Sequence, residues 1–140
     1  MYHPKHIINL IADNVRKTKN PFGVPKFAIN HWWKKVNLPQ KGDALLFTGL
    51  MYQFVPYIEK STSYLTRFED TPWANYLKYG KYVPKLLSGL GLVAITPGAE
   101  KKKFNGILMD IATLLTKSKV DFYYDPTLDD YSGVLLYDLG

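Results

Sequence analysis

Residues 41–53 read KGDALLFTGLMYQ and give the clearest structural signal in the chain. A polar turn is followed by an apolar run, Ala44–Thr48, and then by a tight Thr-Gly bend that leads into a helical pattern. A continuous apolar run is typical of a strand that is buried on both faces of a parallel sheet. In open α/β sheets, ligands bind beyond the carboxyl end of such a strand, yet an inert hydrocarbon, Leu50, stands at this bend.

Apolar residues at helical spacing predict helices on both sides of this segment. The predicted helices span residues 4–19, 51–68, 72–87 and 97–115. Thr71 and Thr96 each precede a proline, which is the pattern of an N-cap followed by proline at the first helical position. Pro84 is expected to bend or split the third helix, because proline removes a backbone hydrogen bond.

Short apolar runs between these helices predict strands. They cover residues 44–48, 90–95 and 120–124, and a last apolar segment spans 134–137. Strands that alternate with helices predict a single α/β domain with a small, mainly parallel sheet flanked by helices and preceded by an N-terminal helix. Residues 1–40 are expected to form that helix and a lead-in segment, and residues 41–140 the α/β domain.

Composition limits the classes of function. The chain has 140 residues, of which 46% are hydrophobic, enough for one domain with a real core. Its net charge of +6 favours anionic partners. The absence of cysteine excludes disulfides, thiolate-bound clusters and thiol nucleophiles within the chain. With no signal-peptide pattern and no apolar run of about 20 residues, we expect a cytoplasmic protein without membrane insertion.

Carboxylates near the C-terminal end are one candidate site. Asp125, Asp129 and Asp130 could serve as an acid/base pair or bind a cation, but carboxylates that flank a turn are more often caps or solvated charges. Ser132 lacks the preceding glycine of a nucleophile elbow. The three histidines are scattered, and a metal shared by the first two would lack further ligands; they are His3, His6 and His31.

Basic residues are a second candidate. Lys101, Lys102 and Lys103 lie near the start of the fourth predicted helix, as contacts to an anion or a partner or, in the favoured interpretation, as a solvated face. The Lys- and Tyr-rich residues 76–82 could stack on bases and contact phosphates, although their apolar members fit a buried stripe better. Helix N-termini near Met51 and Pro97 are further places for an anion.

Three segments resemble the iron–sulfur oxidoreductases that carry the cysteine-rich CCG domain, of the heterodisulfide reductase B/D type. Asn20–Gly23 with Trp33 resembles the lead-in to the first such domain in archaeal members. Leu46–Gln53 resembles the motif in which Phe-x-Gly precedes a cysteine, and Leu50 takes the place of that cysteine. Asp129–Gly140 resembles the acidic-Cys-Cys-Gly stretch, with Tyr131 and Ser132 at the positions of the paired cysteines and Gly133 retained.

The resemblance implies a degenerate or split relative of the first CCG domain. In the family the cysteines bind iron–sulfur clusters or act at disulfides, and the pattern continues beyond Gly140 with a further cysteine pair. Here Gly49, Leu50, Tyr131, Ser132 and Gly133 mark the degenerate positions, so no cofactor and no independent catalysis are expected. The implied function is that of a scaffold or accessory subunit beside a cysteine-bearing partner in an electron-transfer complex, or of a self-associating chain. A basic module for nucleic acid or another polyanion stays open, as does a small-molecule enzyme that uses the carboxylates.

Overall fold

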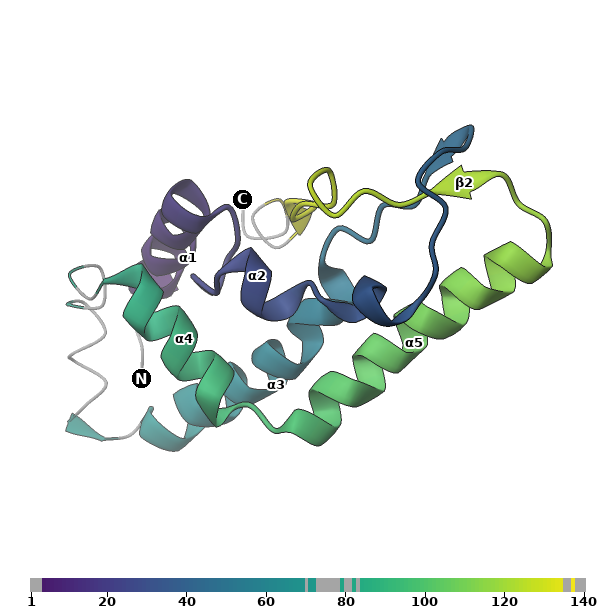
Figure 1. The fold of residues 1–140 in the computed structure, drawn as a ribbon. Coiled ribbons are helices and arrows are strands. Elements are labelled where there is room, and N and C mark those ends of the chain that lie inside the picture. Colours follow the sequence, from purple (N-terminus) through teal and green to yellow (C-terminus); the bar gives the residue numbers. More distant parts are fainter. Residues whose placement is uncertain are drawn as a thin grey trace.

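The computed structural model describes residues 4–69, 71–72, 79, 82, 84–134 and 137. These residues are mainly helical. The helices are α1 (Pro4–Thr18), α2 (Lys26–Ile29), the 3-10 helix η1 (Trp32–Lys35), α3 (Met51–Phe68), α4 (Lys85–Ile95) and α5 (Gly98–Lys117). In Figure 1, α1 and α4 lie at one end of the molecule, and the strands lie at the other end, beyond the last turn of α5.

The two strands, β1 (Ala44–Leu45) and β2 (Phe122–Tyr123), form a parallel pair. Ala44 pairs with Phe122 and Leu45 with Tyr123. The N-terminal helix and the parallel pairing are therefore confirmed, but the sheet among the described residues is much smaller than expected. The prediction that the first strand is buried on both faces is wrong, because Ala44 is exposed and Leu45 is half-buried. With a single neighbouring strand, β1 is an edge rather than the centre of a sheet.

The strand predicted over residues 90–95 is also wrong, because these residues belong to α4. This helix packs closely on the loop after α1: a Cβ atom added to Gly89 would lie 2.0 Å from the carbonyl oxygen of Gly23. The apolar run that resembles a strand in sequence is thus part of a helix that packs at Gly89 against a distant loop. Most of the helix predicted over 72–87, and half of the apolar segment 134–137, lies outside the described residues.

The start of α5 differs from the predicted cap. Pro97, not Thr96, is the N-cap residue of α5, and it makes no side-chain capping bond. The Thr96 hydroxyl instead donates to the carbonyl oxygen of Leu92, 2.6 Å away, in the last turn of α4. The threonine therefore satisfies the end of one helix rather than the beginning of the next.

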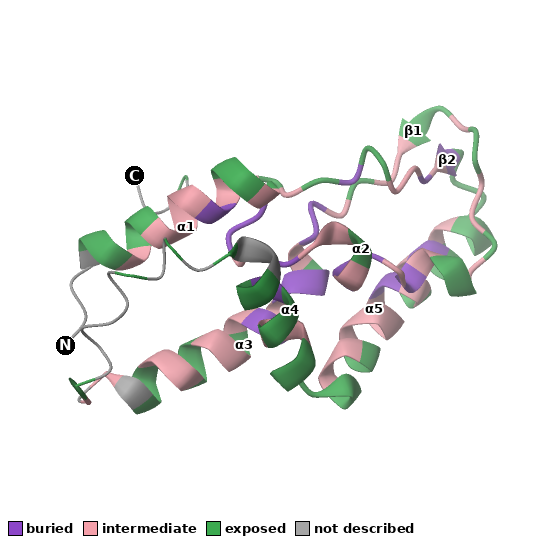
Figure 2. Cartoon of the chain, turned by 60° about the vertical axis from the view of Figure 1, so that its left-hand side comes forward, coloured by how far each residue is buried: buried purple, intermediate pink, exposed green. Residues whose placement is uncertain are grey.

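Two clusters of buried side chains form the core. The first consists of Val24, Ile29, Leu50, Phe54 and Tyr57, and the second of Trp32, Leu108, Ala112 and Tyr124. Figure 2 shows buried residues gathered in the middle of the molecule, while α1 and α4 are largely half-buried or exposed. The first cluster includes Leu50 at the bend and Phe54 and Tyr57 in the first turns of α3, so this end of α3 lies in the core.

Candidate functional site

The bend Thr48–Leu50 contacts a segment near the C-terminal end of the chain. The amide of Ser132 donates to the carbonyl oxygen of Gly49, 3.3 Å away. Gly49 has a φ of 61°, and a Cβ atom placed on it would lie 2.9 Å from the Cβ of Ser132. Leu50 is 2% exposed, and Tyr131 packs against the same core cluster. Four of the positions that the resemblance marks, Gly49, Leu50, Tyr131 and Ser132, thus lie together.

The carboxylate of Asp129 joins the bend to this segment. Asp129 is fully buried, and its Oδ1 accepts the backbone amides of Thr48 at 2.8 Å and Gly49 at 3.1 Å. Its Oδ2 accepts the hydroxyls of Thr48 at 2.7 Å and Tyr124 at 2.8 Å. Four donors therefore satisfy both oxygens, which is the condition for burying a carboxylate. We call Asp129, Thr48, Gly49, Tyr124 and their hydrogen-bonded neighbours the Asp129 network.

Asn30 and Gln53 complete the Asp129 network. The Tyr124 hydroxyl has one proton, which goes to the acceptor-only carboxylate, so it accepts from Nδ2 of Asn30 at 2.9 Å. Burial raises the pKa of Tyr124, and the negative charge of Asp129 raises it further, so the hydroxyl remains a donor. Nε2 of Gln53 donates to Oγ1 of Thr48 at 2.9 Å. The network thereby links the segment after α2, the start of α3 and the segment after β2.

An anion does occupy the start of α3, but it is the protein's own. The sequence suggested a site for an external anion near Met51, and the two amides that precede that helix are taken by the Asp129 carboxylate. All four bonds to this carboxylate come from the same chain. Asp129 therefore fixes the geometry of the bend rather than presenting a free acid or base.

The residues at the bend do not fit an iron–sulfur cluster. Cluster iron takes soft, anionic sulfur ligands, and hydrocarbon, phenol and hydroxyl groups stand here instead. Leu50 belongs to the buried core, and the ring of Tyr131 packs edge-on against Phe54, with 6.0 Å between ring centres. The close approach of Gly49 and Ser132 fills the remaining space. These side chains serve the packing of the core.

The other two candidate carboxylates serve separate local roles. Asp125 accepts the amide of Thr127 at 2.8 Å and its hydroxyl at 2.6 Å, and these hydrogen bonds lower the pKa of Asp125. Asp130 forms an exposed ion pair with Lys26 at 2.7 Å. The three acids therefore do not converge on a common point, which leaves the enzyme hypothesis without an acid/base pair.

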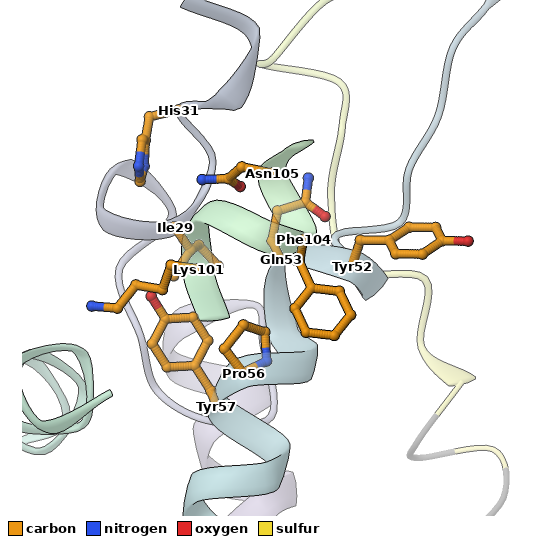
Figure 3. A pocket seen from close by; sticks show the side chains of 9 residues that line it. All are labelled: Ile29, His31, Tyr52, Gln53, Pro56, Tyr57, Lys101, Phe104 and Asn105. Carbon is orange, nitrogen blue, oxygen red and sulfur yellow. The ribbon is translucent and has the colours of Figure 1, made fainter. Parts of the chain in front are cut away.

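A narrow crevice lies between the end of α2 with the following His31, α3 and α5, and Figure 3 shows the side chains around it. Its volume of about 10 Å³ is enough for one water molecule. Lys101 extends past Tyr57, with its ammonium 5.9 Å from the ring centre, and donates to the carbonyl oxygen of Val93 at 2.7 Å. Lys101, a candidate anion contact, therefore satisfies a carbonyl in the last turn of α4. Lys102 and Lys103 are exposed.

The crevice is electropositive on the side of His31. Partial burial lowers the pKa of His31, and the charges of Lys34, Lys35 and Lys101 lower it further. Burial raises the pKa of Tyr57 to about 12. At neutral pH both rings are therefore uncharged, and the lysines provide the positive charge.

The remaining sequence candidates do not form a site within the described residues. His3 lies outside them, and His6 is exposed on α1. No group of three histidine, cysteine or acidic residues in the described part of the chain is arranged to hold a metal ion. In the Lys- and Tyr-rich run 76–82, only Tyr79 and Tyr82 are described, and both are exposed.

Sequence reasoning missed most members of the Asp129 network. Asn30, Gln53 and Tyr124 are isolated polar residues in otherwise apolar or irregular segments, and no motif relates them. The doublet Asp129-Asp130 gave no means of telling the buried acid from the exposed one. A conformational signal did exist at the bend, because a Thr-Gly pair before a helix is suited to a turn whose amides face an acceptor.

No protein-family model, curated protein or solved structure matches the chain. Among the described residues, no helix has both the length and the apolar character needed to cross a membrane. The resemblance to CCG-domain oxidoreductases therefore rests on its sequence motifs alone.

Proposed function

We propose that this chain is a cytoplasmic, cluster-free scaffold or accessory subunit, related to heterodisulfide reductase-type iron–sulfur oxidoreductases. It acts by protein–protein contact in an electron-transfer complex, beside a partner that carries the missing cysteines. In this proposal residues 41–140 are a reduced CCG-like α/β domain, and the β1–β2 pair is the remnant of a larger parallel sheet.

One observation carries the proposal: the bend and the C-terminal segment meet where the resemblance places cysteines. Gly49 and Ser132 are hydrogen-bonded, and Leu50 and Tyr131 pack on one cluster, although about 80 residues separate the two segments. A family frame that has lost its ligands is expected to keep this juxtaposition. The Asp129 network supports the same interpretation, because it joins the two segments through hydrogen bonds and includes no residue that could bind a cluster.

Exposed apolar side chains support a role in binding a protein. Phe27 is 75% exposed, and Leu114, on α5, is 66% exposed. Single exposed apolar residues are ordinary, but Leu114 follows the half-buried Ile107 and Ile111 at helical spacing, so the three side chains form one apolar stripe on α5. The outer end of that stripe is a place where a partner, or a second copy of the chain, can bury further apolar surface.

Copurification from the source cell tests the function. We expect the tagged chain to retain a redox protein that contains cysteine-bound iron, identified by mass spectrometry and by its visible absorption. The same chain with Leu114→Lys serves as a matched surface variant and should retain less of that protein. Recovery of the wild-type chain as a stable monomer without a redox protein would reject the accessory role.

Restoring the cysteines tests the kinship separately. The variant Leu50→Cys, Tyr131→Cys, Ser132→Cys is treated with ferrous iron and sulfide under anaerobic conditions. If the frame is a degenerate cluster site, we expect cluster absorption that three cysteines at the exposed positions Phe27, Leu114 and Leu128 do not give. Equal absorption from both triple variants would contradict the kinship, and circular dichroism verifies that each one is folded.

Binding of a polyanion is the alternative function, and one observation favours it. Burial lowers the pKa of His31, and the nearby charges of Lys34, Lys35 and Lys101 lower it further, so three cations lie near this ring. Real phosphate contacts weaken steeply with salt, with a slope of roughly −0.9 per neutralised phosphate on duplex DNA. Salt titration of DNA and RNA binding tests this alternative, with the double variant Lys34→Gln/Lys35→Gln as the comparison. Negligible binding of the wild-type chain at low salt would rule the alternative out.

A further inference from the structure

An apolar groove lies between α1, α3 and α4, at the end of the molecule opposite the strands (Figure 1). Its volume is about 690 Å³, which falls within the roughly 300–1,000 Å³ of small-molecule sites. Most of the side chains that line it are aliphatic, and they include Ile7, Leu10, Ile11, Ile58, Leu65 and Leu92. None of the described residues that line it carries a charge, so a neutral, apolar molecule suits it better than an ion.

One polar group in the lining has an unused bonding position. Asn14 is 8% exposed, and its Nδ2 donates to the carbonyl oxygen of Pro21 at 2.8 Å. This bond fixes the orientation of the amide, since the opposite orientation would set two oxygens against each other. Oδ1 of Asn14 is buried and accepts no hydrogen bond. A buried acceptor without a partner is unfavourable, so a molecule that brings a donor to Asn14 gains affinity and selectivity there.

We infer that this groove is a binding site for a neutral, elongated apolar molecule that carries one hydrogen-bond donor, such as a long-chain alcohol. The hydrocarbon body lies against the aliphatic side chains of the three helices. The donor reaches Oδ1 of Asn14, which lines the groove and is buried without a hydrogen-bond partner.

Fluorescence titration with N-phenyl-1-naphthylamine, a neutral apolar dye with one N–H donor, tests the inference. We expect saturable enhancement of the dye's emission, and its displacement by 1-decanol. The methyl ether of decanol has the same hydrocarbon chain without a hydrogen-bond donor. Displacing the dye with this ether should need a concentration about three- to tenfold higher than with 1-decanol. In Asn14→Leu this preference should disappear while the ether still displaces the dye. A preference that persists in Asn14→Leu would remove Asn14 from the site.

Two glycines give a matched pair of variants for the groove itself. An added Cβ at Gly91 or at Gly106 meets no atom within 4 Å, but Gly91 lines the groove and Gly106 lies on α5. Gly91→Leu should therefore fill the groove and weaken dye binding at least tenfold, whereas Gly106→Leu should leave it unchanged. Equal affinities of the two variants, or no dye binding by the wild-type chain, would overturn the inference. Neither result bears on the accessory role, which rests on the bend.

Discussion

Replacing Asp129 by alanine tests whether the buried carboxylate holds the bend in place. The substitution removes the acceptor of two backbone amides, those of Thr48 and Gly49, and of two hydroxyls. The hydroxyls have other partners within reach, since Gln53 lies beside Thr48 and Asn30 beside Tyr124. Among the hydrogen bonds of the described residues, the two amides have no other acceptor.

The expected loss follows from these two amides. A buried donor left without an acceptor costs about 1–3 kcal/mol, so the free energy of unfolding should fall by about 2–6 kcal/mol. Asp129→Asn should lower the free energy of unfolding less, by about 1–3 kcal/mol. The side-chain carbonyl of the asparagine can still accept both amides, and the hydroxyls of Thr48 and Tyr124 can rotate to accept from its NH₂ group. The free energy of unfolding of a whole domain is about 5–15 kcal/mol, so the alanine variant should lose a large share of its stability.

The neighbouring acid supplies the control. Asp130 forms an exposed ion pair with Lys26, and exposed pairs contribute about 0–1 kcal/mol. Urea denaturation gives the free energy of unfolding of each variant. It is followed by circular dichroism and by the fluorescence of Trp32, whose ring centre lies 5.0 Å from that of Tyr124. If Asp129→Ala and Asp130→Ala lose the same stability, the buried network does not hold the bend, and the argument for it is wrong.

Three further outcomes are expected. Gly89→Ala should lower the midpoint of thermal unfolding, because the new Cβ would clash with the carbonyl oxygen of Gly23. Gly91→Ala has open space around it and should stabilise α4 by about 1 kcal/mol. A higher midpoint for Gly89→Ala than for Gly91→Ala would contradict the packing. Burial raises the pKa of Tyr57 to about 12, so its contribution to stability should be complete below pH 10 and be lost as the pH rises towards 12. Urea denaturation across this range should show a smaller loss in Tyr57→Phe, and an unchanged loss would count against this assignment. The pKa of His31 should lie below the ordinary value of about 6.5 in an NMR titration, since burial and nearby lysines disfavour the charged ring, and a midpoint at or above that value would contradict it.

Local patterns predicted the helices whose own residues determine them. The apolar periodicity of α1, α3 and α5 lies within each segment, and their positions could be predicted from it. The run over residues 90–95 could not, because an apolar stretch with glycines fits a strand equally well when considered alone. In the structure the helix packs at Gly89 against Gly23, 66 positions earlier in the chain, with no room for a larger side chain. Information about that contact is not present in any short window of sequence.

The candidate site shows the same division. The glycines of the bend and the chemistry of its side chains could be interpreted from sequence, and the resemblance linked Leu50 to Tyr131 and Ser132. The buried acid could not be identified, because Asp129 and Asp130 are equivalent in sequence, and the donors that distinguish them lie 81 positions away at Thr48. The unused oxygen of Asn14 is likewise visible only when its surroundings are known.

The partners of the central bend are synthesised late. At roughly 5–20 residues per second, a growing chain reaches Ser132 about 4–16 s after it passes Gly49. During that interval the amides of Thr48 and Gly49 lack the carboxylate that later accepts them, and β1 lacks β2. The bend and β1 therefore form their final hydrogen bonds only after the last fifth of the chain has been made, and bringing these distant segments together costs the entropy of closing a long loop.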